Sequence, residues 1–239
     1  MPRTILTLGA RNLGGAILDH FLALGWNGAA VARSEDTLSA VRERGALAIA
    51  ADASDPAELE GAIAQTRAEH GSLDLIVNAV TASRPPAAGP WGGGPIAEAT
   101  MEGARGWTVA VAEQAFAFLS TGARALLEGG GGTLVQVTGG SARRAMPGRG
   151  LWAAGAFATR ALTQAAAAEL RERGIHVALL IVDATIESPK TADRTAGAPP
   201  ESLGDMARIA EAVQFLADQS PRAYTHELMV TPAGETWVP

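Results

Sequence analysis

The stretch Thr4-Ile5-Leu6-Thr7-Leu8-Gly9-Ala10-Arg11-Asn12-Leu13-Gly14-Gly15-Ala16-Ile17 decides the fold. Its first five residues are apolar or β-branched, which is typical of a strand. Apolar residues then recur at Leu13, Ile17, Phe21 and Leu24, the spacing of an amphipathic helix. Glycines between strand and helix allow a tight turn and let a phosphate approach the helix N-terminus. Glycine in such a turn is also a common structural feature, so the turn alone leaves a purely structural role open.

Outward from this stretch, apolar β-type runs alternate with longer helical patterns. Strands are expected over 4–8, 28–32, 46–50, 73–77, 133–138, 175–182 and 227–230, and helices over 13–24, 35–44, 56–70, 100–128, 151–173 and 203–218. Ser34 is expected to be the N-cap of the second helix. This alternation predicts an α/β fold, a single doubly wound Rossmann domain over 1–239 with about seven parallel strands and helices on both faces. The polar segment 184–203 is expected to be a mobile loop over the substrate site.

Composition excludes several classes of protein. The chain has 239 residues, no cysteine and a formal net charge of −6. The acidic balance argues against a nucleic-acid partner, and the absence of cysteine removes disulfides and thiolate metal sites. Four scattered histidines make a histidine metal centre improbable, so no metal is expected. No apolar run reaches the roughly 18 residues of a membrane span, and we expect a cytoplasmic protein without a membrane partner.

Several motifs resemble those of the short-chain dehydrogenase/reductase family along nearly the whole chain. The first and last glycines of the family pattern T-G-x-x-x-G-x-G fall on Gly9 and Gly15. Asp52 matches the acidic residue that binds the adenine amino group in this family, and Asn78 matches the first Asn of its N-N-A-G stretch. Arg222 to Leu228 resembles a C-terminal signature of one divergent branch. The resemblance implies an oxidoreductase that acts on a carbonyl or alcohol with a nicotinamide cofactor and a small-molecule substrate.

The sequence departs from the family at the catalytic positions. The resemblance places Gly139 at the catalytic serine, Trp152 at the tyrosine and Ala156 at the lysine. It places Glu113 near the assisting asparagine. An indole N–H is no usable acid at neutral pH, and glycine and alanine offer no polar group, so the general acid–base contribution of about 10²–10⁴ in rate is lost. Redox activity is therefore expected to be weak or absent.

Other residues near the serine position are candidate substitutes. Thr138 or Ser141 could polarise a carbonyl, as could the arginines at 143, 144 and 149, although these are also interpreted as solvated loop charges. Asp183 and Glu187 are carboxylates near the expected site, where a hydrogen-bonded or solvated role is the commoner one. The histidines at 176 and 226 are expected to be structural.

The end of the second strand indicates the cofactor. An acidic residue there favours NAD(H), whereas Arg33 and Ser34 stand there and could bind a 2′-phosphate. NADP(H) is therefore preferred over NAD(H), with Arg11 as a second phosphate candidate and a surface cation as the alternative for Arg33. Leu13 replaces the middle glycine of the pattern and could crowd the diphosphate, so binding of no cofactor stays open. The expected cofactor-binding positions are Gly9, Arg11, Asn12, Leu13, Gly15, Arg33, Ser34, Asp52, Ala53 and Asn78.

Two classes of function remain. The first is an NADP(H)-dependent oxidoreductase. The second is a redox-inactive protein that senses a nucleotide or binds a partner, or a lyase or isomerase that uses the same site. The resemblance and the alanine-rich faces of the helices over 100–128 and 151–173 predict a homodimer or homotetramer. Aromatic residues at 91, 107 and 152, with Met146, indicate an apolar substrate site.

Overall fold

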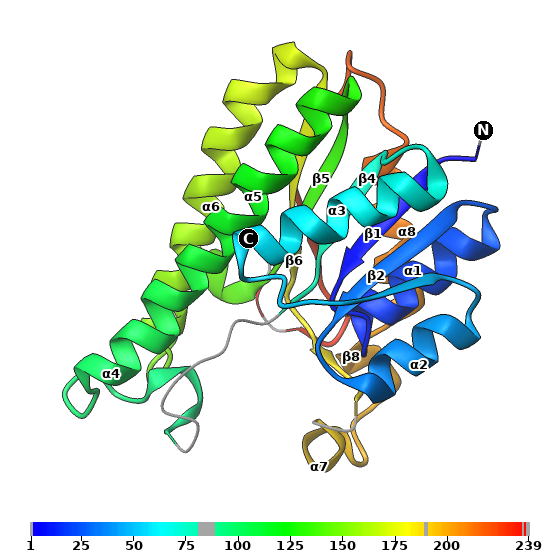
Figure 1. The fold of residues 1–239 in the computed structure, drawn as a ribbon. Coiled ribbons are helices and arrows are strands. Elements are labelled where there is room, and N and C mark those ends of the chain that lie inside the picture. Colours follow the sequence, from blue (N-terminus) through cyan, green and yellow to red (C-terminus); the bar gives the residue numbers. More distant parts are fainter. Residues whose placement is uncertain (1, 81–88, 189–190, 236, 238–239) are drawn as a thin grey trace.

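The computed structural model describes residues 2–80, 89–188, 191–235 and 237. Its central feature is a parallel sheet of seven strands in the order β3-β2-β1-β4-β5-β6-β9. Figure 1 shows this sheet with helices packed around it. This confirms the predicted Rossmann fold. The strands are β1 Thr4–Leu8, β2 Asn27–Ala32, β3 Leu47–Ala50, β4 Leu75–Asn78, β5 Gly132–Gly139, β6 Ile175–Val182 and β9 Glu227–Val230.

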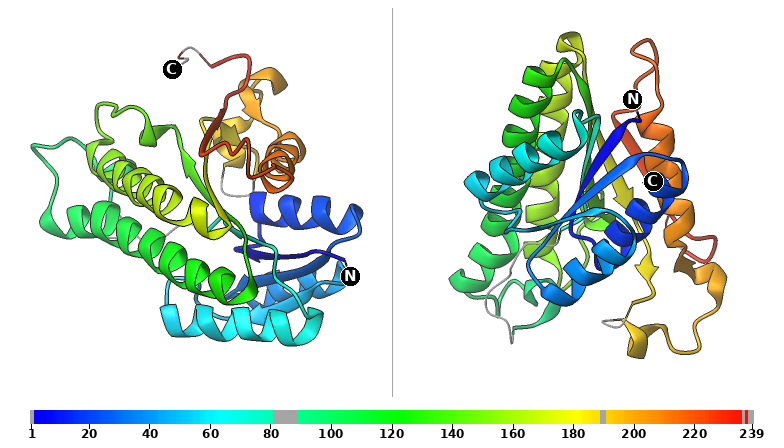
Figure 2. Two further views of the ribbon diagram at one scale, coloured as in Figure 1. Left: turned by 90° about the horizontal axis from the view of Figure 1, so that it is seen from above. Right: turned by 45° about the vertical axis from the view of Figure 1, so that its right-hand side comes forward.

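Helices cover both faces of the sheet (Figure 2). One layer contains α3 Pro56–His70, α5 Ala110–Gly129 and α6 Gly150–Leu170, and the other contains α1 Leu13–Ala23, α2 Glu35–Glu43 and α8 Met206–Ala217. The predicted helix over 100–128 is divided into α4 Met101–Ala104, a π-helical turn Arg105–Val109 and α5. Gly155 of α6 permits this turn to approach, because a Cβ there would lie 2.4 Å from the carbonyl oxygen of Trp107.

The strands supply alternate side chains to two hydrophobic cores. On β1, Ile5 packs with α1 and α8, while Leu6 and Leu8 pack with α3 and α5, and all three are fully buried. A strand exposes successive side chains to opposite faces, so a central parallel strand must be apolar on both. This explains why β1, β4 and β6 are apolar along most of their length and do not alternate apolar with exposed polar residues.

The segment 184–203 differs from the expected loop. Thr185–Ile186 (β7) pairs in parallel with Leu203–Gly204 (β8), and α7 Ala192–Thr195 lies between them. The prediction that the last helix begins at 203 was wrong, because Asp205 caps α8 and accepts hydrogen bonds from the N–H groups of Ala207 and Arg208.

Ser34 is the residue before α2, as predicted, but its hydroxyl does not cap the helix. Its Oγ lies 2.8 Å from Oγ1 of Thr37 and makes no hydrogen bond to the backbone N–H groups of the first turn. In the part of the chain that the structure describes, no helix is long and apolar enough to cross a membrane. Among the same residues, no three histidine or acidic side chains gather into a possible metal site.

The edge strand β9 is fastened by charged groups. Glu227 accepts hydrogen bonds from Arg143 at 2.6 Å and from Arg160 of α6 at 2.7 and 3.0 Å. Burial alone would raise the pKa of Glu227, but the hydrogen bonds and charges of Arg160 and Arg143 outweigh it and lower the pKa. Arg143 is therefore an ion-pair partner of Glu227, which corrects its interpretation as a solvated loop charge.

The two histidines of this region are structural, as predicted. His176 is 1% exposed, and its ring nitrogens lie 3.1 Å from the carbonyl oxygen of Leu216 and 2.9 Å from that of Thr225. Its ring stacks on Tyr224 with 4.2 Å between centroids, while His226 bonds the carbonyl oxygen of Val177. These contacts hold the chain that leads into β9 against β6.

Replacing Phe21 by alanine is expected to lower the free energy of unfolding by about 3–5 kcal/mol, since Phe21 is fully buried and its removal leaves a cavity. Urea denaturation followed by circular dichroism measures this. Leu24→Ala, at the residue that follows α1, is the control: Leu24 is 47% exposed, and its removal should cost less than about 0.5 kcal/mol. Equal losses in both variants would contradict the assignment of the core.

Replacing Glu227 by glutamine is expected to lower stability at pH 7 by about 1–3 kcal/mol, because a carboxylate held by two arginines is lost. The folded pKa of Glu227 lies below the ordinary value of 4.5, so its contribution is present above that pH and disappears as the pH falls through the folded pKa. Denaturation curves between pH 3 and 7 should therefore show a steeper acid loss of stability in the unchanged protein than in E227Q. Parallel pH dependences in the two proteins would contradict the stabilising role of the Glu227 carboxylate.

Candidate active site

The candidate site lies at the carboxyl edge of the sheet. The strand order reverses between β1 and β4, and in open α/β sheets ligands bind outside the carboxyl ends of strands at such a point. The turn after β1 meets the chain after β4 there: Ala79 N–H donates to the carbonyl of Leu8, and a Cβ on Gly9 would lie 3.1 Å from Cγ2 of Val80. Gly9 has φ +82°, which favours glycine.

The turn after β1 depends on two further glycines. A Cβ on Gly14 would lie 1.7 Å from the carbonyl oxygen of Gly9, and one on Gly15 would lie 2.6 Å from that of Ala10. Neither position can hold a side chain without moving the backbone. Gly15 was among the expected cofactor-binding positions, but Gly14 was not. Gly14 makes the closer contact and stands one residue after Leu13, which replaces the middle glycine of the pattern.

The N-terminus of α1 is suited to an anion. The first N–H groups of a helix have no acceptor within the helix, and the first turn of α1 contains no acidic residue. Asn12 is the cap residue and makes no side-chain capping bond. Leu13 is half-buried and packs against the core cluster around Ile17, so its side chain has a hydrophobic partner in the protein. Arg11 is exposed beside the turn.

Arg33 and Asp52 form an exposed ion pair at the ends of β2 and β3. The guanidinium Nη1 lies 3.3 Å from Oδ2 of Asp52, and the side chain of Arg33 is 62% exposed. The hydroxyl and N–H of Ser54 donate to the other Asp52 oxygen. Hydrogen bonds from Ser54 and the charge of Arg33 lower the pKa of Asp52, although partial burial opposes this. Ala53, which stands between Asp52 and Ser54 in the sequence, is buried in the core.

Asn78 is held inside the protein. It is fully buried, its Nδ2 donates to Oε1 of Gln136 at 2.9 Å, and its Oδ1 accepts from Val80 N–H at 3.3 Å. These bonds join the end of β4 to β5 and fix the chain that contacts Gly9. Asn78 therefore positions the glycine turn from behind.

The family's serine and tyrosine positions are in contact. A Cβ on Gly139 would lie 3.4 Å from Cζ2 of Trp152, so the indole fills the space beside the glycine. The ring of Trp91 packs edge-on against Trp152, with 4.3 Å between centroids, and Trp107 lies 6.3 Å away. The structure thus brings together the three tryptophans that the sequence predicted to line an apolar site. Ala156 is buried in a small cluster with Ala142, Leu179 and Ile181.

The substitutes expected from the sequence have varied environments. Thr138 is half-buried at the end of β5 and Ser141 is 7% exposed in the next turn. Arg144 and Arg149 are not solvated loop charges: Arg144 pairs with Asp183 and Glu235, and Arg149 lies over the ring of Trp91 at 4.6 Å. The exposed side chain of Glu113 lies on α5, and Glu187 follows β7.

Asp183 was expected near the site from the sequence, and the structure shows which groups surround it. It follows β6 at the carboxyl edge, its side chain is 15% exposed, and Oδ2 lies 3.3 Å from Arg144. A Cβ on Gly140 would fall 2.0 Å from its Oδ1. Burial raises the pKa of Asp183, the charge of Glu235 adds to the rise, and the charge of Arg144 opposes it. A buried carboxylate with a perturbed pKa is a common mark of a functional site.

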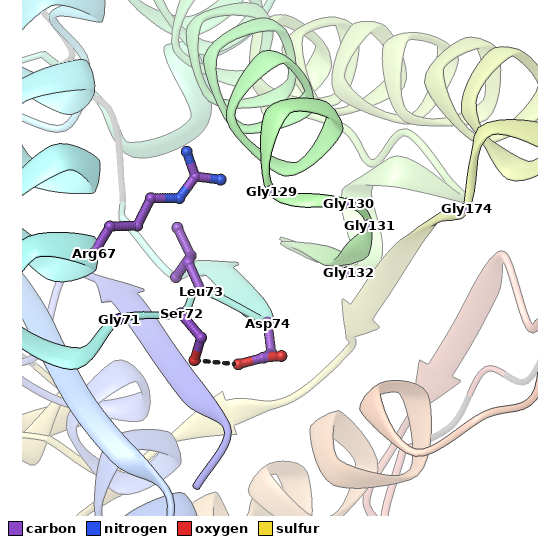
Figure 3. A pocket seen from close by; sticks show the side chains of 10 residues that line it. All are labelled: Arg67, Gly71, Ser72, Leu73, Asp74, Gly129, Gly130, Gly131, Gly132 and Gly174. Atoms are coloured by element: carbon purple, nitrogen blue, oxygen red, sulfur yellow. Dashed lines mark hydrogen bonds between the residues drawn. The ribbon is translucent and has the colours of Figure 1, made fainter. Parts of the chain in front are cut away.

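A cavity of about 360 Å³ lies at the opposite, amino edge of the sheet. Figure 3 shows Arg67, Ser72 and Asp74 around it, with the glycines at 129–132. Arg67 donates to the carbonyl of Ala125 near the C-terminus of α5, and Asp74 accepts from Thr4 N–H and Ser72. The hydrogen bonds of these side chains to the backbone of α5 and β1 indicate a structural role. Because the cavity lies at the amino edge of the sheet, it is separate from the candidate active site at the carboxyl edge.

Comparisons with known proteins agree with this geometry. The family model described as enoyl-(acyl carrier protein) reductase matches residues 9–236. No curated protein matches the chain in sequence. A short-chain dehydrogenase from Rhodopseudomonas palustris is 25% identical over 96% of this chain and 98% of its own, with a TM-score of 0.75.

Two further structures share the fold. A short-chain type dehydrogenase/reductase from Mycobacterium ulcerans is 24% identical over 95% of this chain and 87% of its own, with a TM-score of 0.81. An alcohol dehydrogenase from Thermococcus sibiricus, complexed with 5-hydroxy-NADP, is 21% identical over 100% of both chains, with a TM-score of 0.80. Given the match of the family model to nearly the whole chain, the protein belongs to the short-chain dehydrogenase/reductase family of oxidoreductases.

Proposed function

We propose that the protein binds NADP(H) at the glycine turn and acts as a slow oxidoreductase on a carbonyl or alcohol. The observation that carries this proposal is the turn itself, in which a Cβ at position 14 or 15 would strike the backbone. Such a turn frees the N-terminus of α1 for a diphosphate. The Thermococcus alcohol dehydrogenase with the same fold was solved with 5-hydroxy-NADP, which supports a nicotinamide cofactor here.

Arg33 favours the phosphorylated cofactor. Its guanidinium is mostly exposed at the end of β2 and has only the long ion pair to Asp52 among the described residues. A planar guanidinium can bind a 2′-phosphate through two hydrogen bonds. Asp52, kept ionised by Ser54 and Arg33, would accept from the adenine amino group, as the family resemblance implies.

Turnover is expected to be slow because the family's catalytic groups are missing. When bound, the cofactor would supply or accept the hydride. Trp152 and Gly139 offer no acid, and Ala156 is buried in a cluster of apolar side chains. The three tryptophans would bind an apolar part of the substrate, and the segment 184–203 would cover it.

A redox-inactive role is the second candidate. Trp152 stands at the family's tyrosine position and fills the space beside Gly139, and Trp91 packs edge-on against it. A protein with this site could sense a nucleotide, bind a partner, or act as a lyase or isomerase. Measuring NADPH oxidation across a panel of carbonyl compounds separates the two: turnover above about 1 s⁻¹, ordinary for enzymes, would exclude the redox-inactive role.

We also propose that α5 and α6 pair with a second copy of the chain to form a homodimer or homotetramer. The two helices lie side by side (Figure 1). Each exposes a large aromatic side chain, since Phe116 is 60% exposed and Phe157 is 43% exposed. Burying such residues in an interface is favourable by about 25 cal/mol for each Å² of apolar area.

Replacing Arg33 by alanine is expected to weaken NADPH binding about 10- to 100-fold, the range for loss of a charged hydrogen bond. NADH affinity should stay within about twofold, because NADH lacks the 2′-phosphate. Calorimetric titration with both cofactors measures this, with Arg42→Ala on the neighbouring helix as control, since Arg42 is 53% exposed and pairs with Glu35. If neither cofactor binds the unchanged protein at millimolar concentration, the proposed function fails.

Replacing both Phe116 and Phe157 by glutamate is expected to convert the oligomer into a monomer, because two charges would be buried in the interface. Light scattering coupled to size-exclusion chromatography measures the mass of the particle. Leu24→Glu, at the residue that follows α1 and outside the proposed interface, serves as control. A monomeric unchanged protein at tens of micromolar would contradict the proposed interface.

A further inference from the structure

The alternation of β6 places Asp183 on the face that α6 covers. Leu179 and Ile181 pack in the cluster that contains Ala156 of α6. Side chains at every second residue of a strand lie on one face, about 6.6–7 Å apart. Asp183 follows Ile181 by two residues, one residue beyond the end of β6, and its carboxyl group lies against Gly140 and Arg144.

The register of the sheet places Asp183 beside the missing serine. Gly139 pairs with Val182 at the ends of β5 and β6, so the next residues, Gly140 and Asp183, are also neighbours. All three atoms of the carboxyl group lie within 2.6 Å of the point where a Cβ on Gly140 would stand. The carboxyl group of Asp183 thus occupies the side-chain position that follows the family's serine.

Burial and two neighbouring charged groups shift the pKa of Asp183. Its side chain is 15% exposed, Arg144 lies 3.3 Å away, and Glu235 faces the same guanidinium at 3.4 Å. The guanidinium stacks on the ring of Trp237 with 4.5 Å to the centroid, which holds it in place. Burial keeps the pKa of Asp183 above that of an ordinary aspartate, and Arg144 limits the rise.

We infer that the carboxyl group of Asp183 donates the proton to the substrate oxygen, in place of the tyrosine that this chain lacks. The inference rests on the proposed function. At Gly140, the residue after the serine position, the three atoms nearest to a Cβ all belong to the carboxyl group of Asp183.

The step balances as follows. When bound at the glycine turn after β1, the reduced nicotinamide cofactor would supply a hydride to the carbonyl carbon of the substrate. The carbonyl π bond would then become a C–O⁻ single bond. The O–H bond of protonated Asp183 breaks, a new O–H bond forms on the substrate oxygen, and the product is an alcohol. Asp183 is left as a carboxylate beside Arg144 and regains its proton from water.

The first test observes Asp183 without any turnover. Protein labelled with [4-¹³C]aspartate is titrated by NMR between pH 3 and 8, and the Asp183 signal is identified by its absence in D183N. The midpoint is expected above that of an ordinary aspartate. It should rise further in Arg144→Gln, which removes the opposing positive charge, and fall in Glu235→Gln, which removes a negative one. A midpoint at or below the ordinary value would overturn the inference.

The second test uses the full-length protein with NADPH and a panel of diacetyl, cyclohexanone and methyl pyruvate. Asp183→Asn should lower kcat about 100-fold or more and leave the Kd of NADPH within about twofold. In the unchanged protein the rate should fall as the pH rises through the Asp183 midpoint, and this fall should move to higher pH in Arg144→Gln. A merely structural Asp183 would not produce that displacement. Asp218→Asn, an exposed aspartate paired with Arg3, is the control.

The outcomes separate the two proposals. Unchanged turnover in Asp183→Asn, or NADPH binding without turnover on the whole panel, overturns the role of Asp183 and leaves cofactor binding standing. Absence of NADPH binding overturns the proposed function itself. Thermal melting of each variant identifies misfolding, and the NMR midpoints in the Arg144 and Glu235 variants then decide the question without D183N turnover.

Discussion

The contact between Gly14 and the carbonyl oxygen of Gly9 is the constraint on which the site depends. Because neither Gly14 nor Gly15 has a Cβ, the start of α1 lies directly on the turn that leaves β1. This fixes α1 on the sheet and leaves the N–H groups of its first turn at the carboxyl edge. Asn78 supports the same turn from β4, through bonds to Gln136 and Val80.

Two neighbouring glycines at the end of β5 define the other half of the site. Beside Gly139 lies the indole of Trp152, and beside Gly140 lies the carboxyl group of Asp183. The absence of side chains on β5 is therefore matched by larger groups from α6 and β6.

The C-terminal part of the chain links this region to the rest of the domain. Glu227 joins β9 to Arg143 and Arg160, while Glu235 and Trp237 hold Arg144 against Asp183. Gly234 N–H donates to the carbonyl of Glu201, which connects the tail to segment 184–203. The two charged groups around Asp183, Arg144 and Glu235, thus come from separate parts of the sequence.

Local patterns were enough to predict the fold. Apolar runs, helical spacing and the glycine turn identified the parallel sheet. These features depend on nearest neighbours and on the rule that parallel strands end at one edge. Arg33 and Asp52 were each named as cofactor-binding positions, but the ion pair between them was not predicted. The close contact of Gly14, the ion pairs of Arg143 and Arg144, and the groups that surround Asp183 could not be read from the sequence. They depend on contacts between residues tens of positions apart, and only tertiary packing sets those distances and the burial that tunes a carboxyl group.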